Sequence, residues 1–410
     1  MATETGRKEH ETADRSYRAL LALPSVRRLL IGMQIARIGQ AMMSVTFVLF
    51  TLDVYHSAKL SGMATFFSIF PGLVVSPIAG TLLDRHGRIR LVVLDYLVAL
   101  GSLTLIGVLA LTGTLPAWLL MTIAAVASLT TPLSSTGLRS LFPFMVPRHL
   151  WERVNALDST GYVMAVIVGP PLAAGLVAIF GGAVAFIVIG LCFGVSAIVV
   201  RRLPELSDQT SKAKPLLAQA WDGVVYTWRN PTLRGLGFCM STQNLLNGVM
   251  TIVVPVIVLE RLHLGKTLVG LVFAIQGVSG MLSAIVFGRG DSRNRERMML
   301  TLPMLGGALT TAALLLNANL PMLVLVMAVT GFLNGPLDIA MFTLRQRRTD
   351  TAWMGRAFAI SMSVNYLGIP IGSMAAGILV SRSISVAITF AVVSALISAA
   401  LAVAMIPSRE

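Results

Sequence analysis

Twelve runs of predominantly apolar residues follow one another along the chain, each close to the roughly 20 residues that an α-helix needs to cross a bilayer. They lie near residues 29–54, 60–83, 89–112, 116–142, 154–179, 182–200, 232–259, 267–288, 298–317, 321–344, 357–381 and 384–406. When these runs are threaded back and forth, 27 of the 32 Lys and Arg residues fall in segments on one side. The remainder are Lys59, Arg261, Lys266 and Arg382 on the opposite side, and Arg37 inside a run. Because basic residues accumulate in cytoplasmic loops, the sequence predicts a multi-pass protein of the cytoplasmic membrane with both termini in the cytoplasm.

Composition supports this prediction independently. Hydrophobic residues make up 55% of the chain and charged residues 12%, whereas soluble domains carry about 25% charged residues. The net charge of +14 would suggest a nucleic-acid partner in a soluble protein, but here the basic loops already account for it, so no nucleic-acid partner is expected. Cys192 and Cys239 lie in apolar runs, where we expect small core residues and no disulfide.

The longest interruption in hydrophobicity divides the apolar runs into two sets of six. The predicted organisation is a cytoplasmic tail at 1–27, a six-helix bundle at 28–200, a cytoplasmic linker at 201–231, a second six-helix bundle at 232–406 and a cytoplasmic C-terminus at 407–410. Within the linker, the segment around Leu216 to Trp228 predicts a short amphipathic helix on the membrane surface.

The two sets of six look like copies of each other. A displacement of 208 positions places Gly270 on Gly62, Gly280 on Gly72, Gly288 on Gly80, Leu268 on Leu60 and Arg293 on Arg85. Glycines let helix backbones approach closely in a lipid environment, where packing drives association. The predicted fold is therefore an all-α membrane protein with twelve transmembrane helices in two pseudo-symmetric bundles, an architecture in which transporters place the substrate site between the halves.

The loop between the second and third runs carries the sharpest local motif. It reads Gly80-Thr81-Leu82-Leu83-Asp84-Arg85-His86-Gly87-Arg88-Ile89-Arg90 and resembles the G-x-L-x-D-R-x-G-R-[KR] loop of the major facilitator superfamily. The resemblance implies the major facilitator fold and a transport function. Asp84 at a helix end can accept charge-assisted hydrogen bonds, and Gly87 permits a tight turn. We expect a cytoplasmic latch built from Gly80, Asp84, Arg85, Gly87 and Arg88 with Asp95, Arg139 and Asp158. The alternative is that the arginines serve only to orient the chain.

A second resemblance lies in the fifth run. Gly161, Gly169, Pro170 and Gly175 are similar to the Gly-Pro element of facilitator antiporters, although Ala173 and Ala174 replace its paired glycines. The alternative is that Gly and Pro are simply common in membrane helices. The segment Leu138 to Pro143 and its surroundings resemble the branch that contains macrolide-efflux and enterobactin-exporter-like proteins, which implies export.

Polar residues inside the apolar runs indicate an internal passage, because a charge in hydrocarbon is costly unless it faces protein or water. They are Gln34, Arg37, Gln40 and Ser44 in the first run, Ser134 in the fourth, Gln243, Asn244 and Asn247 in the seventh, and Asn334 and Asp338 in the tenth. In the family that the motif resembles, helices 1, 4, 7 and 10 line the central cavity. We therefore predict that these residues line the substrate cavity.

Asp338 is the predicted proton-coupling residue, because a buried carboxyl can exchange a proton when a cation binds. The alternative is a permanent ion pair with Arg345 that braces the helix. Arg37 either binds an anionic substrate group, holds a neighbouring acid, or extends to the cytoplasmic surface.

The predicted function is a proton-coupled antiporter that exports a small amphipathic compound, such as a drug or siderophore, by alternating access. The alternatives are an importer or a lipid-moving or lysolipid-moving facilitator of the same fold, and then a polytopic membrane enzyme or receptor. No phosphate-binding loop of the G-x-x-x-x-G-K-[ST] type is present, and the histidines show no metal-ligand spacing, so neither cofactor nor metal is expected. The expected partners are a small-molecule substrate, protons and the bilayer, and we expect a monomer.

Topology can be tested by cysteine labelling in a Cys192→Ala, Cys239→Ala background. A membrane-impermeant maleimide added to intact cells should label Arg382→Cys, which is predicted to lie outside, and should label Ser207→Cys in the linker only after the membrane is permeabilised. Labelling of Ser207→Cys in intact cells would place the linker outside and contradict the predicted orientation.

Overall fold

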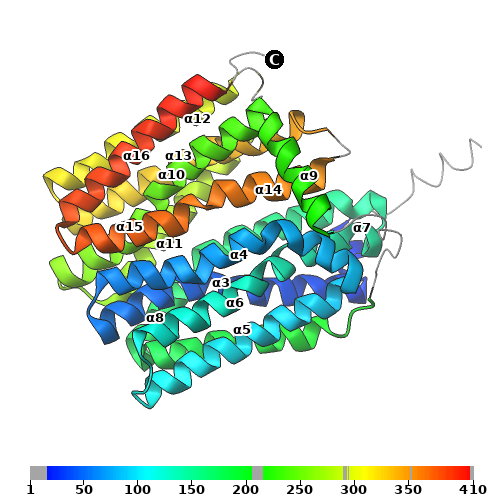
Figure 1. The fold of residues 1–410 in the computed structure, drawn as a ribbon, viewed down its shortest axis with the longest axis horizontal. Coiled ribbons are helices and arrows are strands. Elements are labelled where there is room, and N and C mark those ends of the chain that lie inside the picture. The colour runs from blue at the N-terminus through cyan, green and yellow to red at the C-terminus, as the bar shows by residue number, and fades with distance from the viewer. Residues whose placement is uncertain (1–15, 206–215, 290–292, 294, 351–352, 407–410) are drawn as a thin grey trace, which may run out of the picture.

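The computed structural model describes residues 16–205, 216–289, 293, 295–350 and 353–406, and within them every regular element is a helix (Figure 1). The elements are α2 (Tyr17–Leu21), α3 (Pro24–Tyr55), α4 (Ala58–His86), α5 (Arg88–Leu111), α6 (Ala117–Gly137), η1 (Arg139–Leu141), α7 (Phe142–Met145), η2 (Arg148–Leu150), α8 (Trp151–Val200), α9 (Leu216–Arg229), α10 (Pro231–Val256), η3 (Ile257–Arg261), α11 (Lys266–Phe287), α12 (Glu296–Leu316), α13 (Leu320–Arg347), α14 (Met354–Tyr366), α15 (Gly368–Val380) and α16 (Ile384–Met405). Most of the predicted tail, the centre of the predicted linker and the C-terminal residues 407–410 lie outside the described residues, as do the surroundings of Gly80 and the side chain of Asp84.

The described helices cross the bilayer twelve times. Eleven helical stretches are long and apolar enough to span a membrane, and one of them, Arg148–Val200, has 53 residues. Gly181 interrupts that stretch with φ 82° and ψ 162°, so α8 consists of two spans joined by a sharp bend. The eleventh predicted run is also divided, because the helix breaks at Leu367 between α14 and α15. The prediction of twelve transmembrane helices is thus confirmed.

Polar residues set several helix starts at the ends of the apolar runs. Asn230 precedes Pro231, and its side-chain oxygen accepts hydrogen bonds from the backbone N–H groups of Thr232 and Leu233. Ser57 and Asn319 cap α4 and α13 in the same way. Because a helix satisfies its own backbone hydrogen bonds except at its ends, such caps let each span enter the hydrocarbon without exposed polar backbone groups.

The outer surface of the bundle is apolar. Leu316 is 88% exposed, Leu309 77% and Ile179 74%, and all three lie on spans. Large apolar side chains are exposed on spans of both halves, and extensive apolar exposure is rare on soluble proteins. The arrangement fits a lipid-facing surface and identifies the chain as a multi-pass membrane protein.

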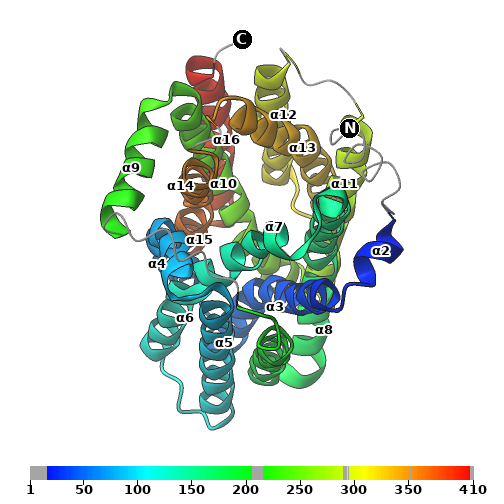
Figure 2. The same ribbon diagram turned by 90° about the vertical axis from the view of Figure 1, so that its right-hand side faces the viewer.

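Two groups of helices lie side by side along the whole bundle. Elements α3 to α8 form the N-half, drawn in blue to green, and α10 to α16 form the C-half, drawn in green to red (Figures 1 and 2). We call the end that carries α2, α9 and the last turn of α16 the proximal end, which is on the right in Figure 1. The opposite end, which holds the turns α3–α4 and α15–α16, is the distal end.

The halves meet most closely where the sequence repeat places glycines. Gly62 on α4 lies against the Ser373 carbonyl and the Gly377 backbone of α15, so that an added Cβ would clash with both. At the repeat-related position on α11, a Cβ on Gly270 would lie 2.7 Å from the Pro170 carbonyl oxygen of α8. The expectation that the shared glycines permit close helix contact is confirmed at these two positions.

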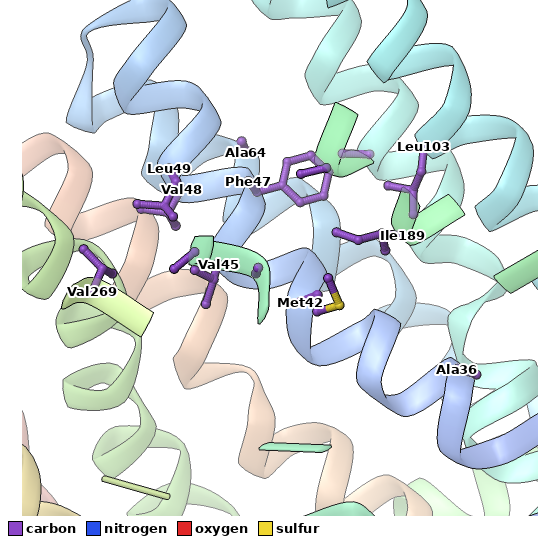
Figure 3. Packing of buried hydrophobic residues seen from close by; sticks show 14 of the residues in the cluster. Ala36, Met42, Val45, Phe47, Val48, Leu49, Ala64, Leu103, Ile189 and Val269 are labelled. Carbon is purple, nitrogen blue, oxygen red and sulfur yellow. The ribbon is translucent and has the colours of Figure 1, made fainter. Parts of the chain in front are cut away.

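The apolar core is continuous between the halves only toward the distal end. Val45 and Val48 of α3 lie near Val269 of α11 within the main cluster (Figure 3). A separate cluster, which includes Leu236 and Leu344, forms the interior of the C-half nearer its proximal end. An ion pair of 2.9 Å between Lys266 Nζ and Asp53 Oδ2 also joins the halves distally. The described conformation is thus closed at the distal end.

The predicted amphipathic helix in the linker is present as α9. Ring stacking and hydrogen bonds hold it against the C-half. The Tyr226 ring stacks on Trp353 with 4.9 Å between the ring centroids, and its hydroxyl accepts a hydrogen bond from the Asp350 N–H. Asn230 Nδ2, just beyond α9, donates to the Arg348 carbonyl at 2.7 Å. Because α9 also packs against α4, the linker contacts both halves.

Substitution of a single glycine, Gly62, should weaken the contact that closes the distal end. Gly62→Ala places a methyl group against α15 backbone that cannot rotate away, so it should separate α4 and α15 and lengthen the distance between spin labels at Lys59→Cys and Arg382→Cys. Gly101→Ala is the matched control, because nothing lies within 4 Å of a Cβ at that position on α5. Electron–electron double resonance should show no shift in the control. Equal distance distributions for both variants would show that the glycine contact does not hold the distal end closed.

Candidate functional site

A cavity of about 220 Å³ lies in the N-half and is lined by α3, α5, α6, η1 and α8. Its walls are formed by Met33, Ala36, Arg37, Gln40, Tyr96, Thr131, Ser134, Ser135, Leu138, Arg139, Tyr162 and Phe193. Three residues predicted for the substrate cavity, Arg37, Gln40 and Ser134, therefore lie together. The mixture of apolar, aromatic and hydroxyl groups is typical of sites for amphipathic small molecules.

Asp158 organises the charged wall of this cavity. Its Oδ1 accepts from Arg37 Nη2 at 2.5 Å, and its Oδ2 accepts from Arg139 Nε at 2.9 Å. A third bond, from Arg37 Nη1 to the Asp158 carbonyl at 2.9 Å, fixes the orientation of the Arg37 guanidinium. One buried carboxylate thereby connects α3, η1 and α8, and charge-assisted bonds of this kind are among the strongest in proteins.

Two glycines of the antiporter-like element make room for α3. A Cβ on Gly161 would clash with the Gln34 side-chain oxygen and would lie 3.7 Å from Arg37 Nη1. Gly169 lies against Ala41, and a Cβ there would be 2.5 Å from the Ala41 methyl. Gly175 differs from these two glycines: nothing lies within 4 Å of a Cβ there, so no neighbouring helix packs closely against it. Gly161 thus lets α8 approach the polar face of α3 closely enough for Arg37 to reach Asp158.

Asp338 lies in the second half of the long helix α13 and is exposed. Among the described residues it has no hydrogen bond or ion pair with a basic group. It lies close enough for its charge to act on Tyr162 of α8, in the N-half, and on Tyr366 of α14, in its own half. Arg345, the predicted alternative partner, donates instead to Ser361 Oγ at 3.0 Å.

The other polar residues predicted in the C-half form an internal chain of amides. Asn244 Nδ2 donates to the Asn365 carbonyl and to its side-chain oxygen, both at 3.0 Å, and its own oxygen accepts from Asn247. Gln243 is buried beside this chain. These bonds hold α10 against α14 inside the C-half. Ser44 donates to the Ala41 carbonyl of its own helix, and Asn334 is half-buried on α13.

The loop motif is held within the N-half by residues on both sides. Gly87 has φ 95°, a conformation that glycine adopts without strain. The Glu205 carboxylate accepts hydrogen bonds from the Ile89 and Arg90 N–H groups at 3.1 and 3.0 Å and so caps α5. Arg88 donates to the Ser140 carbonyl and lies over the Phe144 ring.

The predicted latch residues do not all gather at this loop. Arg139 and Asp158 pair in the cavity wall, and Asp95 is buried in the N-half, 4% exposed, where it faces the hydroxyls of Thr130 and Ser134. Arg85 is exposed at the end of α4. A latch through Asp84 stays a prediction, because its side chain lies outside the described residues.

Several residues at these sites were not predicted. Tyr162 in the cavity wall and Tyr366 on α14 lie near Asp338, Asn365 completes the amide chain, and Glu205 caps α5 beside the motif loop. Glu205 and Asn365 carried a usable signal, since one is an acid beside two basic residues and the other is an amide inside an apolar run. The tyrosines carried no such signal, because aromatic residues are common in spans.

Among the described residues, no group of three His, Cys, Asp or Glu side chains is placed to hold a metal.

A family model described as Major Facilitator Superfamily matches residues 29–373 and 236–410. The chain belongs to this superfamily. A relative from Sinorhizobium fredii, named as an uncharacterized MFS-type transporter y4rN, is 35% identical over 90% of this chain and 92% of its own length. Since the superfamily consists of transporters, this protein is one too, and the family expected from the loop motif is confirmed.

Efflux proteins are among the transporter's other relatives. The macrolide efflux protein A of Streptococcus pyogenes is 22% identical over 86% of this chain and 88% of its own length. The multidrug efflux pump Tap of Mycolicibacterium fortuitum is 27% identical over 83% of this chain and 85% of its own. The expected resemblance to the macrolide-efflux branch is consistent with these matches.

Solved structures show the same fold at low sequence identity. A point mutant of the nucleoside transporter NupG has a TM-score of 0.75 at 11% identity, and the match covers 93% of this chain and 99% of its own. A bacterial homologue of the iron transporter ferroportin, in an inward-facing state, has a TM-score of 0.69 at 17% identity, and the match covers 94% of this chain and 99% of its own. The fold prediction is confirmed.

Removing the Asp158 charge should destabilise the N-half. Asp158→Asn leaves Arg37 and Arg139 without their shared carboxylate, and we expect a cost of about 3 kcal/mol, at the lower end for buried pairs because Arg139 is half-exposed. Asp53→Asn, which removes the exposed distal pair, should cost at most about 1 kcal/mol. Thermal unfolding of the purified variants in one detergent measures the difference. Equal losses would show that the Asp158 cluster is not a structural centre.

Proposed function

We propose that this transporter is a proton-coupled antiporter that exports a small amphipathic organic compound with a cationic group across the cytoplasmic membrane. We further propose that the proximal end is cytoplasmic, as the basic loops predict. The closed distal end then faces outward, and the cavity is reached from the cytoplasm. Rocking of the two halves about the cavity would alternate its access, as in other transporters built from paired repeats.

The observation that carries this proposal is the contrast between Asp338 and Asp158. Asp158 is committed to two arginines, whereas Asp338 is exposed between the halves with no basic partner among the described residues. A carboxyl in that setting can carry either a proton or a bound cation, but simultaneous occupation is disfavoured. Competition between the two ligands for one site is the simplest physical basis for exchange.

The same contrast favours a cationic over an anionic substrate. Arg37 has two bonds to Asp158, one to the side chain and one to the carbonyl, so its charge is already balanced. An anion would have to displace that carboxylate from a buried ion pair, which is costly. We therefore assign Arg37 to holding the neighbouring acid, the second of its predicted roles.

In the proposed cycle, a cation enters from the proximal side and the Asp338 carboxyl releases its proton. The loaded halves rock, the substrate leaves distally, and a proton from outside reprotonates Asp338 and allows the return. Tyr162 lies near Asp338 and near both arginines, and Tyr366 lies near Asp338 and Tyr162. Their aromatic faces suit the apolar and cationic parts of such a substrate.

Export is supported by the names of the efflux relatives and by the antiporter-like element on α8. The loop motif with Asp84 is proposed as a latch that closes the proximal side when the cavity opens outward.

An importer of the same fold is the alternative, and it predicts the opposite result in cells. Cells that express the protein should accumulate less ethidium or erythromycin than vector controls, whereas an importer would raise their content.

Asp338→Asn tests the coupling. In proteoliposomes loaded with ethidium and given an imposed proton gradient, this variant should lose gradient-driven transport and retain only the rate of empty liposomes. Glu152→Gln is the matched control, because Glu152 is an exposed acid at the proximal start of α8. Normal gradient-driven transport by Asp338→Asn, in a preparation where the wild type is active, would overturn its role.

A further inference from the structure

Asp95 lies in a small side pocket of the N-half that the proposed function does not use. The pocket has a volume of about 20 Å³ and is enclosed by α3, α4, α5, α6 and α8. Its polar lining residues are Gln40, Ser68, Asp95, Ser128 and Thr131, and the remainder are apolar or aromatic. The Asp95 residue is only 4% exposed.

No basic group pairs with Asp95 among the described residues. The ionisable groups in these parts of the neighbouring elements include Arg37 on α3, Arg139 in η1, Asp158, Tyr162 and Cys192 on α8 and, next in sequence on α5, Tyr96. Both arginines are directed to Asp158, and the Asp95 carboxyl lies close to the hydroxyls of Thr130 and Ser134. Asp95 therefore differs from Asp158, although both acids lie inside the same half.

This setting accommodates a neutral carboxyl far more easily than a charged one. An ionised carboxylate buried without a cation loses its hydration and gains only weak hydroxyl contacts in return. A protonated carboxyl needs one acceptor and can still receive hydrogen bonds from hydroxyl groups. In the described conformation, the geometry fits an Asp95 that carries a proton.

The side pocket adjoins the main cavity. Gln40, Thr131 and Phe193 line both spaces, so they form the wall between them. A volume of 20 Å³ is enough for one water molecule, which needs about 10–15 Å³ and polar partners. Gln40 and Arg37 also lie three residues apart on one face of α3, so the arginine is positioned next to the shared wall.

We propose that Asp95 is a second proton-binding site, in the N-half, that exchanges its proton with the main cavity past Gln40 and Thr131. The proton leaves the carboxyl for water in the cavity, and the carboxylate left behind faces the hydroxyls of Thr130 and Ser134 and the water-sized side pocket. The inference rests on the proposed function in that proton movement drives transport. Together with Asp338, it gives one exchangeable site in each half.

Infrared titration of the reconstituted, full-length protein tests this directly, because the carbonyl band of a protonated carboxyl disappears when the group ionises. The probe is the proton alone, and no transported compound is needed. Wild-type protein should show a protonated-carboxyl band that is lost as the pH rises, and Asp95→Asn should lack one component of it. Asp338→Asn should lack a different component, and Glu152→Gln should retain both of these components. An unchanged band in folded Asp95→Asn would overturn the proposal.

Two further variants separate proton binding from structural support. Asp95→Glu should show the titrating component that Asp95→Asn lacks, at a shifted frequency because the carboxyl has moved. If Asp95 were ionised throughout and served only as a structural hydrogen-bond acceptor, the wild type would have no such component for Asp95→Glu to restore. Gln40→Leu should retain the Asp95 component but slow its exchange after a pH jump. Exchange at the wild-type rate in Gln40→Leu would overturn the route past Gln40.

The infrared titration and the transport assay can fail independently of each other. If ethidium transport proved independent of a proton gradient while the Asp95 band still titrated, the antiport proposal would fail and the proton site would remain. If transport was gradient-driven and Asp95→Asn left the band unchanged, the antiport proposal would remain and this inference would fail.

Discussion

A charge inside a bilayer must be neutralised or reached by water, and the acids within the spans meet this constraint in different ways. Asp158 is neutralised by Arg37 and Arg139, and this cluster also connects three elements of the N-half. Asp338 lies exposed between the halves, and Asp95 is buried against hydroxyls. The arrangement concentrates paired charge in one wall of the cavity and leaves Asp95 and Asp338 without a basic partner among the described residues.

Close helix packing supplies the second constraint, because hydrophobicity does not bring helices together in lipid. Gly62 and Gly270 occupy matching positions in the two halves, and each lies at a contact with the opposite half, on α15 and α8 respectively. Gly72 and Gly280 match in the same way within their own halves, against Ser128 and Gly331. The sequence repeat thus corresponds to a repeated set of contacts, and the inter-half pair closes the distal end.

Much of the fold could be predicted because bilayer thickness and loop charge leave few alternatives. The twelve spans, the linker helix and the glycine contacts all follow from short-range patterns. Prediction was less complete for the site, where the identity of a residue says little about its partners. Asp95 and Asp158 are both acids near basic loops, yet one faces hydroxyls and the other two arginines. Contacts between residues as distant in sequence as Arg37 and Asp158 depend on how the helices rotate.

By itself, the sequence determined that the chain crosses a membrane, how many times it does so, and to which transporter superfamily it belongs. These properties depend on local hydropathy, charge and a contiguous motif. Only the tertiary structure decided which charges cancel, which face a cavity, and at which end the halves are joined. The reason is physical: a helix presents a different face with each rotation of about 100° per residue, and packing against neighbouring helices selects the face that meets the cavity.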